Sequence, residues 1–562
     1  MRRALVPMRR LVISTVLLTA LPVVAQQPTP APKPVTEAVR VHVVNVEVFV
    51  TGKDGQAVLD MRPDEFELYE DGRPVVLSNF LAPAQSLVAE AVQTRPAASA
   101  PGEIAPPSEE EQQRTLVVFV DDLNLTASTR QPVLNRLEQF LTERLQEGYR
   151  VILFCFSRSL RRLTPLTRDN SQITAALGVL KRSAFEGMML QAQRDSILRD
   201  MGRPMAQEAG EMGDAAREAI LDNTRSGASE TTILERSLLE ALTTLVDSLS
   251  GVPGRKVVLF VSRGIPTNPN ADLFVEFGER FAGGGGQDLL SPENRLRHPV
   301  HVVALHANAS RITFYTINAG SEEGFGISAQ VQVPNASTIG TNDVINRDES
   351  LSELTAGTGG RKLFNADALE GLAADLDTYY SLGYSPDHFG DGRYHRLSVK
   401  VKRAGVSVRC REGYLDKTPE QRQADRTTAA LLAGGNANPL GARVGLGTPQ
   451  RQGRKKMAVS LTVAIPAASL VLLEAGEFHE GKVSITIAVS KRDGRTSDVH
   501  RETFPIKVPS RVVAGFLGQE TSFDFTVLVE PGDTSVSVTA RDDVAQLESV
   551  VVSPLPVEPK KQ

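Results

Sequence analysis

Three oxygen-bearing side chains stand at alternate positions in one short segment, at Asp122, Asn124 and Thr126. A carboxylate followed by an amide and a hydroxyl at this spacing can direct several oxygens to one hard cation, Mg²⁺ or Mn²⁺. The segment directly follows the apolar run TLVVFV, and open α/β sheets bind ligands at the carboxyl ends of their strands. Asp121 is one residue out of register but can assist. The residues therefore predict a cation site that a sheet must position.

The same residues also have a structural explanation. Asx and Thr residues commonly cap a following helix. The segment 129–147 carries Leu134, Leu137 and Leu141 on one face, as an amphipathic helix does. A cation site and a capping segment at a degenerate site both stay open from the residues alone.

Known catalytic motifs are absent from the sequence, including Gly-x-Ser-x-Gly, His-Glu-x-x-His and the phosphate-binding Gly-Lys-Ser/Thr. His298, His301 and His306 do not share a helix face, so their spacing disfavours zinc there. We therefore expect a protein that is not an enzyme. An atypical hydrolase whose residues converge only in space remains the less favoured alternative.

Basic residues are concentrated in a predicted hairpin over 393–411, which includes Arg393, His395, Arg396 and Lys400. Such a surface could contact an anionic lipid or glycan. Charged edges also deter unwanted strand pairing, and this is the commoner use of such residues. The hairpin therefore predicts a solvated sheet edge.

A sheet covered by helices is expected around the Asp122 segment. From Thr115 onwards, apolar strands alternate with helical stretches, which is typical of a parallel sheet. The strands YRVILFCFS, GRKVVLFVSR and RITFYTIN follow the first one along the chain. We expect this α/β domain to span 113–380, with a helical insertion at about 183–230.

Alternating apolar and polar residues predict β-structure on both sides of this domain, over 39–82 and 381–414. Because a few strands are too small a unit to be stable alone, we expect the two segments to pair as one sandwich. The segment 456–555 predicts a second, C-terminal β-sandwich. The ranges 83–112 and 415–455 lack periodicity and are interpreted as linkers.

Length and composition indicate a globular, exported protein. The 562 residues predict roughly three to four domains, and 41% hydrophobic residues are enough to bury cores. Residues 1–25 combine four arginines, an apolar run and small residues before a cut after Ala25, as signal peptides do. The apolar run is shorter than the ~20 residues of a transmembrane anchor. A Pro-rich linker over 26–38 follows, and we expect a periplasmic, cell-surface or secreted protein.

Charge and cysteine content exclude two further classes of protein. The formal net charge of −5 disfavours nucleic-acid binding, which requires a basic face. Only Cys155 and Cys410 are present, so the chain is not a disulfide scaffold.

The Asp122 segment resembles the metal-ion-dependent adhesion site of von Willebrand factor A (VWFA) domains, normally Asp-x-Ser-x-Ser. The resemblance implies a further threonine ligand before a central helix, and Thr232 matches that place. It also implies an aspartate after the fourth strand, where this chain has Arg263 in the turn Ser-Arg-Gly. An arginine there either abolishes metal binding or replaces the metal by pairing with Asp122.

Over about 40–414 the chain is similar to VWFA-related domain proteins of the Acidobacteria type. The shared motifs include VNVEVFVTGKDGQ, TLVVFVDDLNLT, SELTAGTGGRKLFNAD and YYSLGYSPDHFGDGRYH. The resemblance implies a doubly wound, Rossmann-like A-type domain inserted between β-sandwich-forming segments. It implies adhesion to a protein or cell-surface ligand whose acidic group completes the coordination of Mg²⁺ or Mn²⁺. The alternative is a structural or assembly component of the cell envelope with a dead metal site.

Overall fold

The computed structural model describes residues 43–83, 113–202, 211–281, 299–319, 336–364, 369–435, 437–453, 456–491 and 495–557. The predicted signal peptide, the Pro-rich linker and residues 84–112 lie outside the described residues. Within the described ranges, no helix is both long and apolar enough to cross a membrane.

A six-stranded sheet forms the centre of the α/β domain, in the order β10–β9–β8–β5–β6–β7. The strands are β5 (Arg114–Asp121), β6 (Arg150–Phe156), β7 (Leu160–Arg162), β8 (Arg255–Ser262), β9 (Ile312–Asn318) and β10 (Lys362–Leu363). All pairs are parallel except β6 with β7 at the edge. The strand order reverses between β5 and β8, and this switch point is where doubly wound sheets place their ligands.

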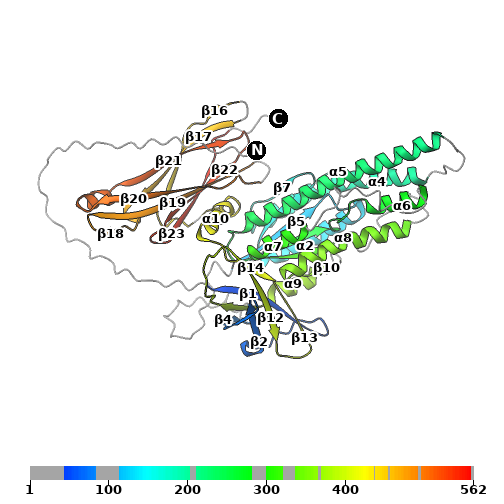
Figure 1. The fold of residues 1–562 in the computed structure, drawn as a ribbon, viewed down its shortest axis with the longest axis horizontal. Helices are drawn as coiled ribbons and strands as arrows, with labels where there is room; N and C mark the ends of the chain where they lie inside the picture. The colour runs from blue at the N-terminus through cyan, green and yellow to red at the C-terminus, as the bar shows by residue number, and fades with distance from the viewer. Residues whose placement is uncertain are drawn as a thin grey trace.

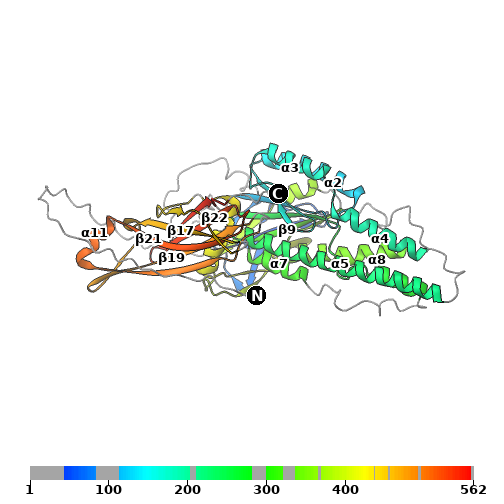
Figure 2. The ribbon, with the colours of Figure 1, turned by 90° about the horizontal axis from the view of Figure 1, so that it is seen from above.

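Helices cover both faces of this sheet (Figure 2). They are α2 (Ala127–Gln146), α3 (Asn170–Arg182), α4 (Glu186–Gly202), α5 (Glu211–Leu249), α6 (Ala271–Phe281), α7 (Pro299–Ala309), α8 (Ala336–Thr358) and α9 (Leu369–Asp377). Val117 and Phe119 of β5 face a core shared with α5, α7 and α8, whereas Leu116 and Val118 face α2, α3 and α9. Because both faces are buried, the strands are continuously apolar in sequence.

Helices α4, α5 and α6 continue beyond the sheet (Figure 1). A separate apolar cluster holds them together, including Leu198 of α4, Ile220 of α5 and Phe277 of α6. The helical insertion that the sequence predicts at about 183–230 is therefore α4 followed by the first half of α5.

Strands from before and after the α/β domain form two packed sheets, β13–β1–β11–β4 and β14–β12–β2–β3. The strands are β1 (Val44–Gly52), β2 (Phe66–Glu70), β3 (Arg73–Val75), β4 (Asn79–Leu81), β11 (Tyr380–Tyr384), β12 (Tyr394–Val401), β13 (Val406–Cys410) and β14 (Gly413–Leu415). Strand β1 pairs with β11 and β13, and β2 pairs with β12. The α/β domain is thus inserted into this N-terminal sandwich.

The C-terminal sandwich packs the sheet around β17 and β21 against the sheet around β19 and β22. Its strands are β15 (Arg443–Leu446), β16 (Gln450–Gln452), β17 (Lys456–Pro466), β18 (Leu473–Ala475), β19 (Phe478–Ser490), β20 (His500–Pro509), β21 (Glu520–Val529), β22 (Ser535–Asp542) and β23 (Leu547–Pro554). Short helical turns lie at 467–469 and 510–517.

The interpretation of 415–455 as a linker is wrong, because this range contains helix α10 (Pro419–Ala433), β15 and β16. Thr418 and Gln421 form a capping box, with Pro419 in the first turn. The hydroxyl of Thr427 donates to Thr539 on β22, while Leu432 joins the core of the α/β domain. A composition rich in Thr, Gly and Ala hid a helix that joins two modules.

Candidate functional site

The carboxylate of Asp122 is held by a guanidinium group. Nε and Nη2 of Arg130 donate to its two oxygens at 2.8 and 2.9 Å. Both side chains are buried, with 4% and 1% of their surfaces exposed. The thiol of Cys155 donates to the same carboxylate at 3.3 Å. An arginine does pair with Asp122, but it comes from α2, whereas the sequence suggested Arg263.

Asp121 ends strand β5 and points into the switch point of the sheet. Its carboxylate accepts from the backbone N–H of Asn124 at 3.2 Å, from the Asn124 amide at 2.9 Å and from the Ser262 hydroxyl at 2.6 Å. Burial raises the pKa of Asp121 to about 6, against the lowering effect of these hydrogen bonds. Asp121 is therefore integrated into the loop as its main hydrogen-bond acceptor.

Glu235 on α5 is a buried acid that the sequence analysis missed. The Asn124 amide donates to its Oε2 at 3.2 Å, and its Oε1 has no hydrogen-bond partner among the described residues. Burial raises the pKa of Glu235 to about 8, although nearby Arg347 opposes the shift. The available signal was its place on the apolar stripe of α5, three and seven residues before Leu238 and Leu242.

Arg347 on α8 supplies a second guanidinium group to this loop. It donates to the side-chain oxygen of Asn124 at 2.6 Å and to the carbonyl of Gly264 at 3.0 Å. Its Nε also donates to Asp343 at 2.9 Å. Although burial alone would raise the pKa of Asp343, Arg347, Arg194 and Arg263 hold it below the usual range. The side-chain oxygen that a cation would take from Asn124 is thus bound to an arginine.

Arg263 pairs with Asp343 at 3.7 Å. The prediction that Arg263 pairs with Asp122 is therefore wrong: Arg263 pairs with Asp343, and Arg130 pairs with Asp122. The turn Ser262-Arg263-Gly264 still contributes to the loop, because the Ser262 hydroxyl binds Asp121.

The two threonines of the predicted site take part in helix structure. Thr126 precedes α2, and its hydroxyl lies 2.9 Å from that of Thr129, while its backbone N–H donates to Thr129. Thr232 lies inside α5 and donates to the carbonyl of Ala228 at 2.7 Å. The expected loop before the central helix is absent at Thr232, since α5 runs unbroken from Glu211 to Leu249.

Helix α4 covers the loop that carries Asp122. The backbone N–H of Gly187 donates to the carbonyl of Asp122 at 2.9 Å, and a Cβ at this position would lie 2.1 Å from the carbonyl oxygen of Leu125. The cavity left beneath α4 has a volume of about 60 Å³ and is lined by Asn124, Glu235 and Arg347, among others. It is large enough for water, and α4 leaves little further space over the loop.

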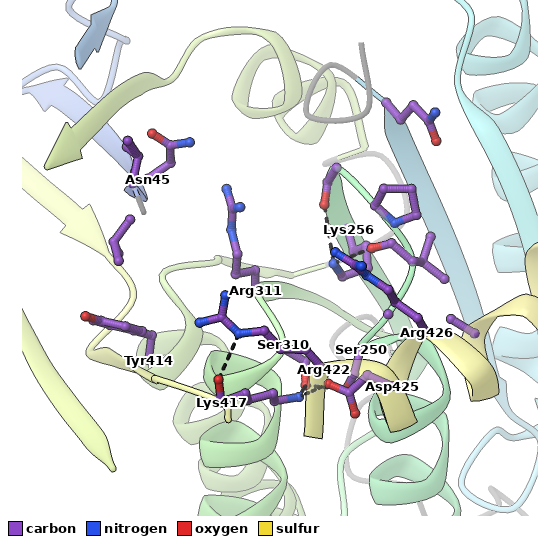
Figure 3. A pocket seen from close by; sticks show the side chains of 18 of the residues that line it. Asn45, Ser250, Lys256, Ser310, Arg311, Tyr414, Lys417, Arg422, Asp425 and Arg426 are labelled. Carbon is purple, nitrogen blue, oxygen red and sulfur yellow. Dashed lines mark hydrogen bonds and ion pairs between the residues drawn. The ribbon is translucent and has the colours of Figure 1, made fainter. Parts of the chain in front are cut away.

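A much larger cavity, of about 1890 Å³, lies where the N-terminal sandwich, the α/β domain, α10 and the C-terminal sandwich meet (Figure 3). Its described lining has eight basic side chains and three acidic ones. The basic residues are Arg62, Arg150, Lys256, Arg311, Arg411, Lys417, Arg422 and Arg426. The acidic residues are Asp416, Asp425 and Glu548. The cavity therefore has an excess of positive charge.

Two basic side chains of this lining, Lys256 and Arg411, are buried and donate to backbone carbonyls. Lys256 donates to the carbonyls of Val252 and Gly254, and burial lowers its pKa to about 7. Arg411 donates to the carbonyl of Asn45 at 2.8 Å, while its Nε and Nη1 have no hydrogen-bond partner among the described residues.

Other charges around the cavity are paired. Arg311 lies 3.4 Å from Glu47, Lys417 binds Asp425 at 2.6 Å, and Arg422 binds Asp416 at 2.9 Å. Figure 3 shows Arg311, Lys417 and Arg422 around the same open space. An anion would therefore find the most unpaired donor groups beside Lys256 and Arg411.

Comparisons with known proteins give only distant likenesses. No protein-family profile matches the sequence, and no curated protein matches it. Proximal thread matrix protein 1 from the mussel byssus is 12% identical, with a TM-score of 0.21 over 47% of this chain and 46% of its own. This chain therefore spans about half the length of that structure.

Two bacterial structures give similar values. The conserved hypothetical protein BatB from Bacteroides thetaiotaomicron is 12% identical, with a TM-score of 0.22 over 47% of this chain and 97% of its own. A von Willebrand factor type A protein from Catenulispora acidiphila is 9% identical, with a TM-score of 0.18 over 80% of this chain and 67% of its own. Values this low transfer no function.

Proposed function

We propose that this chain is an exported, non-enzymatic binding protein whose VWFA-like domain is a scaffold. It engages an acidic group of a protein or cell-surface ligand in the basic cavity between its modules. The observation that carries this proposal is the lining of that cavity, where eight basic side chains face three acidic ones and where Lys256 and Arg411 are buried. Buried positive charge without an equal number of acids favours an anionic ligand.

The cation-dependent mode of adhesion is less well supported by the site. Asp122 is neutralised by Arg130, and Asn124 is bound by Arg347. The loop lies beneath α4, and the cavity of about 60 Å³ there leaves little space for an acidic group of a partner. In this proposal basic side chains of the cavity supply the positive charge that Mg²⁺ or Mn²⁺ supplies in adhesion sites.

A second candidate function is that of a structural or assembly component of the cell envelope. The buried Arg130–Asp122 pair favours it, because an arginine in the place of a cation keeps the fold without a metal. In that case the two β-sandwiches make the contacts with other envelope proteins.

The test is calorimetric titration of a short poly-L-glutamate peptide into the full chain, at low and at physiological salt. We expect saturable binding that weakens with salt, and about a tenfold loss of affinity in Arg311→Gln. Arg451→Gln on the exposed strand β16 is the matched control and should bind as the wild type does. Absence of saturable heat, or an equal loss in the control, would favour the structural role instead.

A further inference from the structure

Two histidines and several carboxylates meet at one end of the N-terminal sandwich, far from the Asp122 loop in sequence. His388 follows β11, His395 lies on β12, and Glu70 ends β2. One ligand atom from each of these three residues lies within 4.8 Å of the other two. In the sequence, His395 belongs to the predicted basic hairpin, and no spacing or motif singles out His388 or Glu70.

Each imidazole is oriented by a carboxylate at Nδ1. Nδ1 of His388 lies 2.9 Å from Asp416, which is fully buried, and Nδ1 of His395 lies 2.9 Å from Asp71. Histidines that bind metals are usually held in this way, because a carboxylate at one ring nitrogen leaves the other nitrogen free to ligate. The arrangement therefore leaves Nε2 of His388 to ligate, while Nε2 of His395 faces the carboxylate of Asp391.

Nε2 of His388 lies 3.4 Å from Oε1 of Glu70 and is buried without a hydrogen-bond partner among the described residues. That oxygen already accepts from the hydroxyls of Tyr384 and Tyr414. With its proton on Nδ1, His388 turns a lone pair towards a carboxylate oxygen, and the two repel each other. A cation between them removes the repulsion.

A separation of 3.4 Å suits a metal ion between these two atoms. In tetrahedral zinc sites the metal–ligand distances are about 2.0–2.2 Å, which places neighbouring ligand atoms roughly 3.4 Å apart. The two rings stack with centroids 3.9 Å apart and planes at 13°, so two imidazolium charges there would repel strongly. One divalent ion can serve both rings, after one of them tilts to aim its lone pair.

Local backbone geometry brings the two histidines together. Gly390 and Gly392 have φ of +66° and +73°, which folds the segment from His388 to Arg393 back onto β12. Asp391, in the same turn, lies 3.2 Å from Nε2 of His395. The carboxylate of Asp391 therefore offers a further oxygen ligand beside Nε2 of His395.

We infer that Glu70, His388 and His395 form a site for one borderline-soft divalent ion, with Zn²⁺ as the expected metal. Asp416 and Asp71 orient the histidines, and Tyr384 and Tyr414 orient Glu70. Imidazole nitrogens favour Zn²⁺ over Mg²⁺, which prefers an all-oxygen shell. The inference does not rest on the proposed binding of an acidic ligand, although Tyr414 and Asp416 also line the basic cavity.

The test is titration of Zn²⁺ into the full chain after chelation, with Co²⁺ as a spectroscopic probe. We expect one saturable equivalent of Zn²⁺, the intense visible bands of tetrahedral Co²⁺, and no competition by Mg²⁺. His388→Gln and Glu70→Gln should each weaken binding at least about tenfold, and Asp416→Asn by about 10- to 100-fold. Circular dichroism checks that each variant is folded.

His306→Gln is the matched control, because His306 also pairs with a carboxylate, Asp247 at 3.0 Å, but belongs to none of the metal-ligand groups among the described residues. It should bind Zn²⁺ as the wild type does. The inference is wrong if the wild type gives no saturable heat and octahedral Co²⁺ bands. It is also wrong if His388→Gln binds as tightly as the wild type, or if only the control loses affinity.

Discussion

At the scale of single residues, buried charges decide what the Asp122 loop can do. Asp122 and Arg130 neutralise each other, with almost no solvent contact. Breaking such a pair by removing one partner leaves an uncompensated buried charge, whereas replacing both partners by apolar groups is often tolerated. Variants of this pair therefore test whether the Asp122 loop depends on the guanidinium of Arg130.

Arg130→Met should lower the free energy of unfolding by about 3–5 kcal/mol, because the Asp122 carboxylate is left buried and unpaired. The double variant Asp122→Leu/Arg130→Met should recover much of this loss. Urea denaturation measures both, with Arg136→Met on the exposed face of α2 as the control. Equal stability of the single variant and the control would contradict this account.

Mg²⁺ and Mn²⁺ should leave the melting temperature of the wild type unchanged, since Arg130 and Arg347 already bind the oxygens of Asp122 and Asn124. Thermal unfolding with and without each ion measures this, and calorimetric titration into the wild type and Asp122→Ala measures binding directly. Saturable heat in the wild type that disappears in Asp122→Ala would show that the adhesion-type site is functional.

Glu235 should make stability depend on pH. Its pKa is raised from 4.5 to about 8 by burial, so the folded state binds a proton that the unfolded state releases within this window. The free energy of unfolding should therefore fall as pH rises from ~5 to ~8, by on the order of 3 kcal/mol.

Glu235→Gln keeps the uncharged shape and should flatten that dependence, which urea denaturation at a series of pH values measures. In this variant a smaller fall in the free energy of unfolding should remain at the acidic end of the range, because burial raises the pKa of Asp121 to about 6. Glu240→Gln, on the exposed side of the same helix, should retain the full slope. A slope unchanged in Glu235→Gln would show that Glu235 is not the group responsible.

At the scale of elements, the insertion decides access to the switch point of the sheet. Helix α4 lies on the loop after β5 through Gly187, and α5 passes the same loop with Glu235. Because α5 continues without a break from the insertion into the central helix, no separate loop remains to carry a threonine ligand. The insertion therefore covers the loop at the carboxyl end of β5.

Gly187→Ala should displace α4, because the new Cβ would meet the Leu125 carbonyl oxygen at 2.1 Å. Hydrogen exchange of residues 122–126 should then become faster. Gly227→Ala is the control, since its Cβ would meet no atom closer than 3.5 Å, and it should stabilise α5 by about 0.5–1 kcal/mol. Unchanged exchange in Gly187→Ala would contradict the proposed cover.

At the scale of the whole molecule, long-range pairing makes the N-terminal strands part of a later module. Strand β1 lies between β11 and β13, with Val46 opposite Leu382 and Val48 opposite Cys410. Helix α10 then links the α/β core to β22 of the C-terminal sandwich. The basic cavity and the histidine cluster both lie at these junctions.

If the chain is cut between β4 and β5, the two fragments should remain associated. A site-specific protease sequence placed within 84–112 allows the cut, and native size-exclusion chromatography measures whether both fragments co-elute. We expect co-elution, because β1 and β2 remain hydrogen-bonded to β11, β12 and β13. Separate elution of the N-terminal fragment would refute the inserted arrangement.

Local pattern was enough for the strands and for most helices. The continuous apolar run before Asp122 predicts a buried strand, and β5 occupies it; alternation in VNVEVFV predicts β1. Such patterns report which face of an element is buried, because side chains repeat along a strand or helix with a fixed period. Helix α10 was not predicted, because the small residues around it have the composition of a linker.

Charge partners depended on the tertiary structure. Asn124 meets Arg347 across 223 positions, and Glu70 meets Tyr414 across 344. No local periodicity encodes such distances, because they depend on which surfaces pack when the α/β domain is inserted into the sandwich. The sequence placed an acidic loop at the end of a strand, but the fold supplied arginines to that loop and gathered the histidines elsewhere.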